Sequence, residues 1–223
     1  MKPIDPNPVS NTANPPGTTT VTEQGKAEKN TQDPYVRRIL EAARELFIAS
    51  GLEAVSMHAI AKRAGIGQGS LYRRFSDKGE ICSMLLRDST ERFLTGLEHE
   101  LVFPEAGSGA LGHLRSSIGR IVDFIEQHAE LLQLIKSEFT GKKQLTQFEH
   151  PFFRRLNEFL KELLVRAAAS GEIPAIDPQF TATALIAVLS PDLYLFQQKQ
   201  YGSTKEQITA GILALFVDGL QPL

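Results

Sequence analysis

The sequence predicts an all-α fold for this chain of 223 residues. Through most of its length, apolar residues recur three and four positions apart, which is the spacing of an amphipathic helix. The pairs Asp33-Pro34 and Asp177-Pro178 each place a capping aspartate before a proline, a residue order that begins helices. No segment shows the alternation of apolar and polar residues that a half-buried strand requires. We therefore expect an N-terminal three-helix domain joined to a larger helical bundle.

Composition divides the chain into three parts. Residues 1–32 contain five prolines and few apolar side chains, too little apolar surface to offset the entropy of ordering, so we expect a disordered tail. Residues 33–79 should form the first helical domain and residues 80–223 the second. The formal net charge is −2, but residues 34–80 hold eight basic and five acidic side chains. Basic charge concentrated in one segment favours contact with nucleic acid.

The first domain has the spacing of a helix-turn-helix. After a helix over residues 34–51, Ser56 should cap the second helix. Ala61 is small where two helices cross, and Gly65 accommodates the left-handed conformation of a sharp turn. Leu71 should then anchor the following helix against the core, which leaves the outer face of that helix free to enter a major groove.

The outer face of this recognition helix carries groups that donate to phosphates and base edges. They are Gln68, Ser70, Arg73 and Arg74, with Tyr72 at the flank. In the next helix, Asp77 and Glu80 have the spacing of a capping box. Lys78 lies in the first turn, where an ammonium beside unpaired main-chain N–H groups can bind a phosphate. A small packing unit with a solvated basic face is the alternative that these residues leave open.

The pattern Ala61-x3-Gly65-Ile66-x3-Ser70-Leu71-Tyr72-x2-Phe75-x2-Lys78 resembles the DNA-binding signature of the TetR family of bacterial transcription regulators. The similar region runs from about Pro34 to Leu86. Two positions depart from the usual pattern, since Gly67 stands where serine or another capping residue is common and Gly79 where glutamate is common. The residues expected to contact double-stranded DNA are Ser56, His58, Gln68, Gly69, Ser70, Tyr72, Arg73, Arg74 and Lys78. His58 is included because it lies two residues after Ser56 and could reach a base edge, and a solvent-exposed histidine without a DNA contact is the alternative.

The resemblance also implies a function. Regulators of this type are dimers in which a small molecule binds the C-terminal helices, moves the connecting helix and changes the spacing of the two reading heads. We therefore expect a homodimeric repressor that a small apolar or aromatic effector releases from a palindromic operator. An activator of the same family, or a helical interaction module without specific DNA binding, is the alternative. A DNA-packaging protein is disfavoured, because residues 81–223 hold thirteen basic and seventeen acidic side chains.

The first helices of the second domain predict a ligand pocket. A connecting helix should run from Lys78 to about Leu101, residues 110–139 favour two helices with a break near His128, and another helix is expected over residues 151–170. These helices supply more large apolar side chains than a thin bundle needs, which favours an apolar or aromatic ligand. The expected lining residues are Phe93, Leu97, Ile121, Phe124, Phe152, Phe153, Leu156 and Tyr194. A solid core without a cavity is the alternative.

Two further apolar helices are expected at the end of the chain. Residues 179–198 are apolar on nearly all sides until Asp192, so this helix should be buried on two faces, and Pro191 should kink or split it. Residues 203–219 should form the last helix. Two such helices from each of two copies would make a self-complementary four-helix interface. The expected dimerisation residues are Leu185, Ile208, Ile212, Leu215 and Phe216.

Motifs of catalysis are missing from the sequence. The five histidines show no metal-binding spacing with carboxylates, and the chain has no phosphate-binding loop, nucleophile elbow or dinucleotide fingerprint. Cys82 is the single cysteine, which excludes an internal disulfide and a thiolate metal cluster. We therefore expect no enzymatic activity, cofactor or metal. Because the sequence has neither a run of about eighteen apolar residues nor a signal-peptide core, we expect a cytoplasmic protein without a membrane span.

Overall fold

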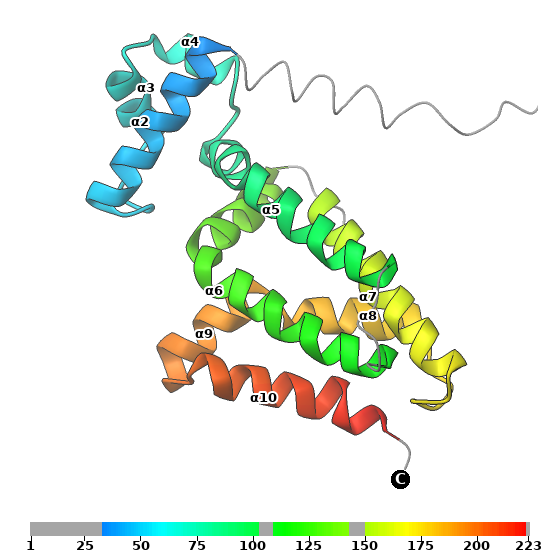
Figure 1. Ribbon diagram of the computed structural model, residues 1–223. Coiled ribbons are helices and arrows are strands. Elements are labelled where there is room, and N and C mark those ends of the chain that lie inside the picture. The colour runs from blue at the N-terminus through cyan, green and yellow to red at the C-terminus, as the bar shows by residue number, and fades with distance from the viewer. Residues whose placement is uncertain (1–32, 103–108, 143–149, 222–223) are drawn as a thin grey trace, which may run out of the picture. The chain divides into compact units, whose positions relative to one another are not determined.

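The computed structural model describes residues 33–102, 109–142 and 150–221, with the backbone alone described at 138–142. The chain divides into two units, Met1–Arg38 and Ile39–Leu223, and each is described by itself. The expected tail over residues 1–32 lies outside the described residues. Every regular element in the described ranges is helical (Figure 1), so the all-α prediction is confirmed there.

The N-terminal elements are α2 (Pro34–Ser50), α3 (Met57–Ala64) and α4 (Gln68–Tyr72). Asp33 begins α2 as predicted, since its Oδ1 accepts a hydrogen bond from the N–H of Tyr35 at 2.8 Å. Gly51 follows the helix with a φ of +77°, a left-handed conformation that glycine adopts without steric cost. The predicted start and end of the first helix are therefore confirmed.

The remaining elements are α5 (Lys78–Val102), α6 (Ala110–Lys142), α7 (Pro151–Ala169), α8 (Pro178–Val188), α9 (Pro191–Tyr201), α10 (Lys205–Phe216) and a short 3-10 helix, η2 (Asp218–Leu220). Helix α6 packs against α5, α7, α9 and α10, while α8 packs against α7 (Figure 1). The central position of α6 explains its almost continuous apolar stripe, in which Leu114, Ile118 and Ile121 are among the largest fully buried side chains.

One prediction about these helices is wrong and another is confirmed. The break expected near His128 does not occur, because α6 continues from Ala110 to Lys142. No proline interrupts this stretch and no glycine lies near its middle, so nothing removes a main-chain hydrogen bond. At Pro191 the predicted split does occur, with α8 ending at Val188 and a bend of 44° to α9.

Helix starts in the second half follow from local chemistry. Asp177 accepts hydrogen bonds from the N–H groups of Gln179 and Phe180 at 2.9 and 3.0 Å, as predicted for an N-cap. Ser190 caps α9 in the same way, through the N–H of Leu193. Among the described residues no single helix is long and apolar enough to cross a membrane, although the bent pair α8 and α9 meets that test by length and composition.

Candidate nucleic-acid interface

Helices α3 and α4 form the predicted helix-turn-helix. Ser56 precedes α3 in an extended conformation, and its Oγ accepts a hydrogen bond from the N–H of Ala59 at 3.1 Å. Helix α3 ends at Gly65, whose φ of 63° and ψ of 40° lie in the left-handed region. The next N–H, that of Ile66, bonds back to the main-chain oxygen of Ala61 at 3.1 Å. The predicted cap and turn are both confirmed.

Buried side chains hold α4 in place. Ala61 is 1% exposed, Leu71 is completely buried and Phe75 is 2% exposed. The small side chain of Ala61 permits the close approach of α3 and α4. Leu71 and Phe75 are buried and anchor α4 and the residues after it in the core. Arg63 of α3 also pairs with Glu45 of α2, with 2.5 Å between Nη2 and Oε2. The orientation of α4 is therefore set by packing and leaves one face outward.

That outward face carries the polar groups expected to read DNA. Gln68, Gly69, Tyr72 and Arg73 are exposed, whereas Ser70 and Arg74 are half-buried. Arg73 donates through Nη2 to the Ser70 hydroxyl at 2.9 Å, and Arg74 donates through Nη1 to the Ser70 main-chain oxygen at 3.2 Å. Both guanidinium groups thus lie along α4, and arginine N–H groups are of the kind that donates to phosphates.

His58 and Gln68 meet across the turn. The Nε2 of Gln68 lies 2.7 Å from the Nδ1 of His58, and both side chains are exposed. His58 is the second residue of α3 and Gln68 the first of α4, so the contact joins the N-terminal ends of the two helices. The sequence contained both residues but carried no signal for their pairing, because they are ten positions apart on different helices.

Lys78 lies in the first turn of α5, as predicted, but its ammonium has partners within the protein. Nζ donates to the main-chain oxygens of Leu52 and Val55 at 2.7 and 3.0 Å. Asp77 caps the helix by accepting from the N–H of Glu80 at 2.9 Å. An ammonium has three N–H groups, so two are used in the turn between α2 and α3 and one is left for a phosphate.

The predicted ligand-lining residues come together in the core of the C-terminal helices. Phe93 of α5 and Phe124 of α6 stack with centroids 4.4 Å apart, and Phe124 stacks on Phe152 of α7 at 5.9 Å. Phe153 meets Phe152 edge to face at 5.4 Å. The other four, Leu97, Ile121, Leu156 and Tyr194, are buried in the same core. The structure therefore gathers these side chains from four helices.

Two histidines flank this aromatic cluster. The ring of His128 meets Phe124 edge to face at 4.7 Å, and that of His150 meets Phe153 at 6.2 Å. His150 also caps α7, with Nδ1 accepting from the N–H of Phe152 at 3.2 Å. Burial lowers the pKa of both imidazoles below the usual 6.5, because it disfavours the charged form. Burial therefore favours the neutral form of both rings.

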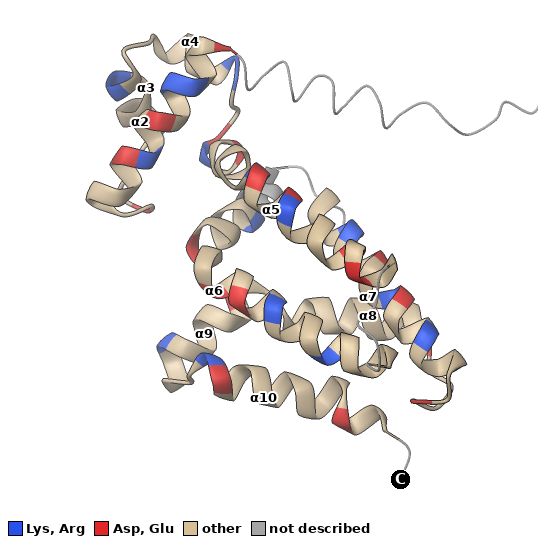
Figure 2. Ribbon diagram, in the orientation of Figure 1, with Lys and Arg blue, Asp and Glu red and all other residues tan. Residues whose placement is uncertain are grey.

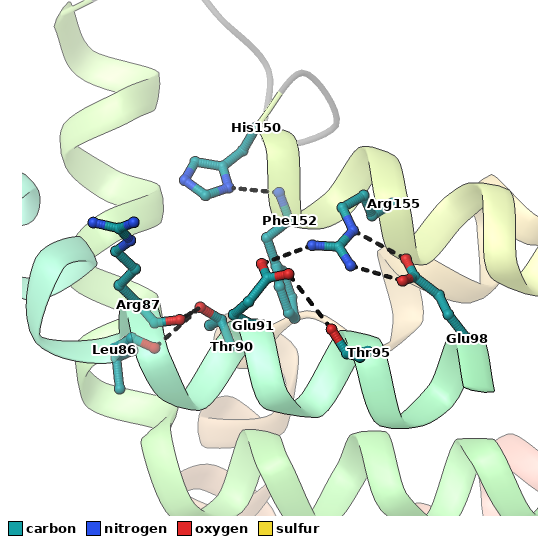
Figure 3. A network of polar contacts seen from close by, with 9 residues as sticks. All are labelled: Leu86, Arg87, Thr90, Glu91, Thr95, Glu98, His150, Phe152 and Arg155. Atoms are coloured by element: carbon teal, nitrogen blue, oxygen red, sulfur yellow. Dashed lines mark hydrogen bonds and ion pairs between the residues drawn. The ribbon is translucent and has the colours of Figure 1, made fainter. Parts of the chain in front are cut away.

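A polar network beside the cluster joins α5 to α7 (Figure 3). Arg155 of α7 binds both carboxylate oxygens of Glu98, at 3.0 and 2.7 Å, and one of Glu91 at 2.8 Å. The hydrogen bonds to Glu98 raise the pKa of Arg155. This two-pronged contact is the geometry in which arginine differs from lysine. Sequence reasoning missed it, because Arg155 and Glu98 are 57 positions apart.

The predicted dimerisation set needs a correction. Leu185 is completely buried within the protomer and Ile212 is 5% exposed, so neither can lie on a partner-facing surface. Leu215 is 68% exposed, whereas Ile208 and Phe216 are half-buried. Helices α8 and α10 carry hardly any charged side chains along their length (Figure 2). Within the protomer, each of these helices packs one of its apolar faces against the core. Periodicity alone does not reveal which apolar face that is.

No group of three or more histidine, cysteine, aspartate or glutamate side chains within the described ranges could hold a metal ion. The thiol of Cys82 is completely buried in α5, where it serves as a small apolar group.

Comparisons with known proteins agree with this geometry. The family model described as bacterial regulatory proteins, tetR family, matches residues 39–83. An HTH-type transcriptional regulator of Staphylococcus aureus (strain MRSA252) is 27% identical over 185 residues, which span 83% of this chain and 94% of the relative.

Solved structures share the fold. A bacterial regulatory protein in the tetR family from Rhodococcus RHA1 aligns with a TM-score of 0.62 at 16% identity, covering 86% of this chain and 100% of its own. The transcriptional regulator FadR from Bacillus subtilis, solved in complex with stearoyl-CoA, aligns with a TM-score of 0.60 at 19% identity, covering 83% and 99%. The alignments thus cover both the helix-turn-helix and the helical bundle that follows it in the chain.

Proposed function

Because this chain belongs to the TetR family of bacterial transcriptional regulators, we propose that it is a homodimeric repressor of the bacterial cytosol. It binds a palindromic operator in double-stranded DNA and leaves it when a small apolar or aromatic effector binds. The observation that carries the proposal is α4, whose apolar side is locked by Leu71 while its polar side faces outward. An exposed polar helix held in this way is what major-groove readout requires.

The residues around α4 divide into two roles. Gln68 stands at the start of the helix, where side chains meet base edges, so it supplies sequence information. Ser56, Tyr72 and Lys78 contribute hydroxyl or ammonium donors to phosphates, which set position and affinity. Three further residues, Ser70, Arg73 and Arg74, extend the donor surface along the same helix, and Gly69 lets the backbone approach the DNA closely.

An effector site in the aromatic cluster of α5, α6 and α7 completes the proposal. The stacked rings of Phe93, Phe124 and Phe152 would part to admit an apolar or aromatic group. FadR from Bacillus subtilis was solved with stearoyl-CoA, a ligand with a long apolar chain, and this supports the proposed ligand chemistry. Because α5 follows α4 in the chain and itself carries Phe93 of this cluster, an effector that prefers the DNA-incompetent arrangement would release the operator.

A dimer is expected because a single α4 is too short to specify an operator. One short helix reads only a few base pairs, too few to specify a site in a genome, whereas a two-fold dimer reads two half-sites about 34–36 Å apart. The outer side of α10 offers Leu215 beside the small residues Gly211 and Ala214, all exposed in the protomer. A surface of this kind suits a self-complementary helix contact.

Selection from a randomised duplex pool tests the proposal. The full chain should enrich one palindromic sequence, and titration of that duplex should show affinity that falls steeply with salt. Apolar compounds, among them stearoyl-CoA, free fatty acids and steroids, should then include one that raises the melting temperature and releases the duplex. Failure to enrich any sequence would overturn DNA reading itself. If one sequence is enriched but no such compound releases it, the proposed class of effector is wrong while DNA binding stands.

A further inference from the structure

The contact between His58 and Gln68 bears on which base the recognition helix selects. In this pair the Gln68 amide nitrogen is 2.7 Å from the imidazole Nδ1. An amide nitrogen can only donate, so Nδ1 must be the acceptor and the ring proton must be on Nε2. Both side chains are exposed at the same end of the helix-turn-helix. The imidazole therefore fixes the direction in which the amide of Gln68 points.

We infer that His58 is a positioning residue that makes Gln68 selective for adenine. The inference rests on the proposed function, in which Gln68 meets a base edge. A planar amide has one N–H on the side of its oxygen and one on the opposite side. When His58 accepts the second N–H, the oxygen and the first N–H remain as an adjacent acceptor and donor. That pair matches the N6 donor and N7 acceptor of adenine in the major groove.

Without His58, Gln68 would be free to turn its amide over. The reversed amide presents its NH2 group toward acceptors, which guanine and thymine display in the major groove. A glutamine that samples both orientations discriminates poorly, whereas one held in a single orientation leaves a wrong base with unpaired polar groups. The role assigned to His58 is thus to exclude the reversed amide, and it requires no contact between His58 and DNA.

The arginines of α3 and α4 have hydrogen-bond partners other than His58 and Gln68. Arg73 and Arg74 on α4 bond to the two oxygens of Ser70. On α3, Arg63 is turned to Glu45 of α2. In the described part of the helix-turn-helix, the amide of Gln68 is therefore paired with His58.

Base preference, measured by selection from a randomised duplex pool with the full chain, tests the inference. Wild type should enrich adenine about tenfold over the other bases at the position where Gln68→Ala abolishes the preference, as expected for one bidentate contact. His58→Ala should keep the melting temperature and the other positions of the site, while adenine enrichment falls to within about twofold. His58→Lys, which can only donate, should attract the amide oxygen and shift the preference from adenine toward guanine. A purely structural histidine would leave the base preference unmoved.

Two controls separate the outcomes. Lys62→Ala changes another exposed residue of α3 and should leave the base preference intact. In the Gln68→Ala background, His58→Ala should cause no further change at that position, because the two residues act as a unit. Unchanged adenine enrichment in His58→Ala would overturn the inference while the proposed function stands. A wild-type chain that enriches no sequence at all would overturn both.

Discussion

Lys78, the first residue of α5, donates a hydrogen bond of 2.7 Å from its ammonium to the main-chain oxygen of Leu52, just after α2. A second bond of 3.0 Å reaches Val55. Because α2, α3 and α4 make up the reading head and α5 leads away from it, this one side chain stabilises the head from within. The lysine therefore has a structural role beside the proposed phosphate contact.

Replacing Lys78 by methionine should separate these two roles. The change removes two charge-assisted hydrogen bonds but keeps the aliphatic stem, so the free energy of unfolding should fall by about 1–3 kcal/mol. The salt dependence of operator binding should flatten by about one charge. Denaturant unfolding and operator titration measure the two effects. Unchanged stability contradicts the structural role, and an unchanged salt slope contradicts the phosphate contact. Lys62→Met, at an exposed position of α3, is the matched control for stability.

The two glycines of the turn should respond in opposite ways. Gly65 has a φ of 63°, so Gly65→Ala should cost about 1–2 kcal/mol of stability. Gly67 has a φ of −68° and open space where a Cβ would be placed. It caps α4 without a side-chain hydrogen bond, so Gly67→Ser should add a few tenths of a kcal/mol. Thermal unfolding of both variants measures these stability changes. Stability changes of the same sign would contradict this account of the turn.

Acid should weaken the C-terminal helices through His150. Burial lowers the pKa of its imidazole below 6.5 in the folded chain, so the unfolded chain binds the proton more readily. The stabilising contribution is complete above pH 6.5 and is lost as pH falls toward the folded pKa, by at most about 1.4 kcal/mol per pH unit. Protonation of Nδ1 would also remove its bond with the N–H of Phe152.

Two substitutions isolate this effect. His150→Asn keeps an oxygen that can cap α7 but cannot titrate, so the contribution of this one group to the pH dependence of stability below pH 6.5 should disappear. His150→Ala loses the cap as well and should be less stable at every pH. His128, whose pKa is also lowered by burial, contributes pH dependence of the same sign, so part of the dependence should persist in this variant. A His150→Asn variant with the wild-type slope would exclude His150 as its source.

Leu215→Asp should produce a folded monomer. Leu215 is 68% exposed in the protomer, so the change spares the core, while a carboxylate buried in a dimer contact without a partner costs several kcal/mol. Sedimentation should show one protomer, and operator affinity should fall because both half-sites are no longer held together. Ile212→Asp is the contrasting variant, since Ile212 is buried within the protomer and its replacement should unfold the chain. A Leu215→Asp dimer of wild-type affinity would locate the interface elsewhere.

The sequence by itself determined the helix ends and the turn. The caps at Ser56 and Asp177, the turn at Gly65 and the split at Pro191 all occur where they were predicted. Each depends on the conformational preference of one residue or on a hydrogen bond to a neighbour two or three positions away. Periodicity likewise predicted that Leu71, Phe93 and Phe124 face inward, because a helix fixes which positions share a face.

Only the tertiary structure decided which partners those faces and side chains have. Leu185 and Ile212 lie on apolar faces that could have met a second copy, yet the protomer's own core buries them. The contacts of His58 with Gln68, Lys78 with Leu52 and Arg155 with Glu98 join residues 10, 26 and 57 positions apart. Sequence patterns report the orientation of a side chain relative to its own helix. The packing of one helix against another sets its partners, and that packing arises from the whole core at once.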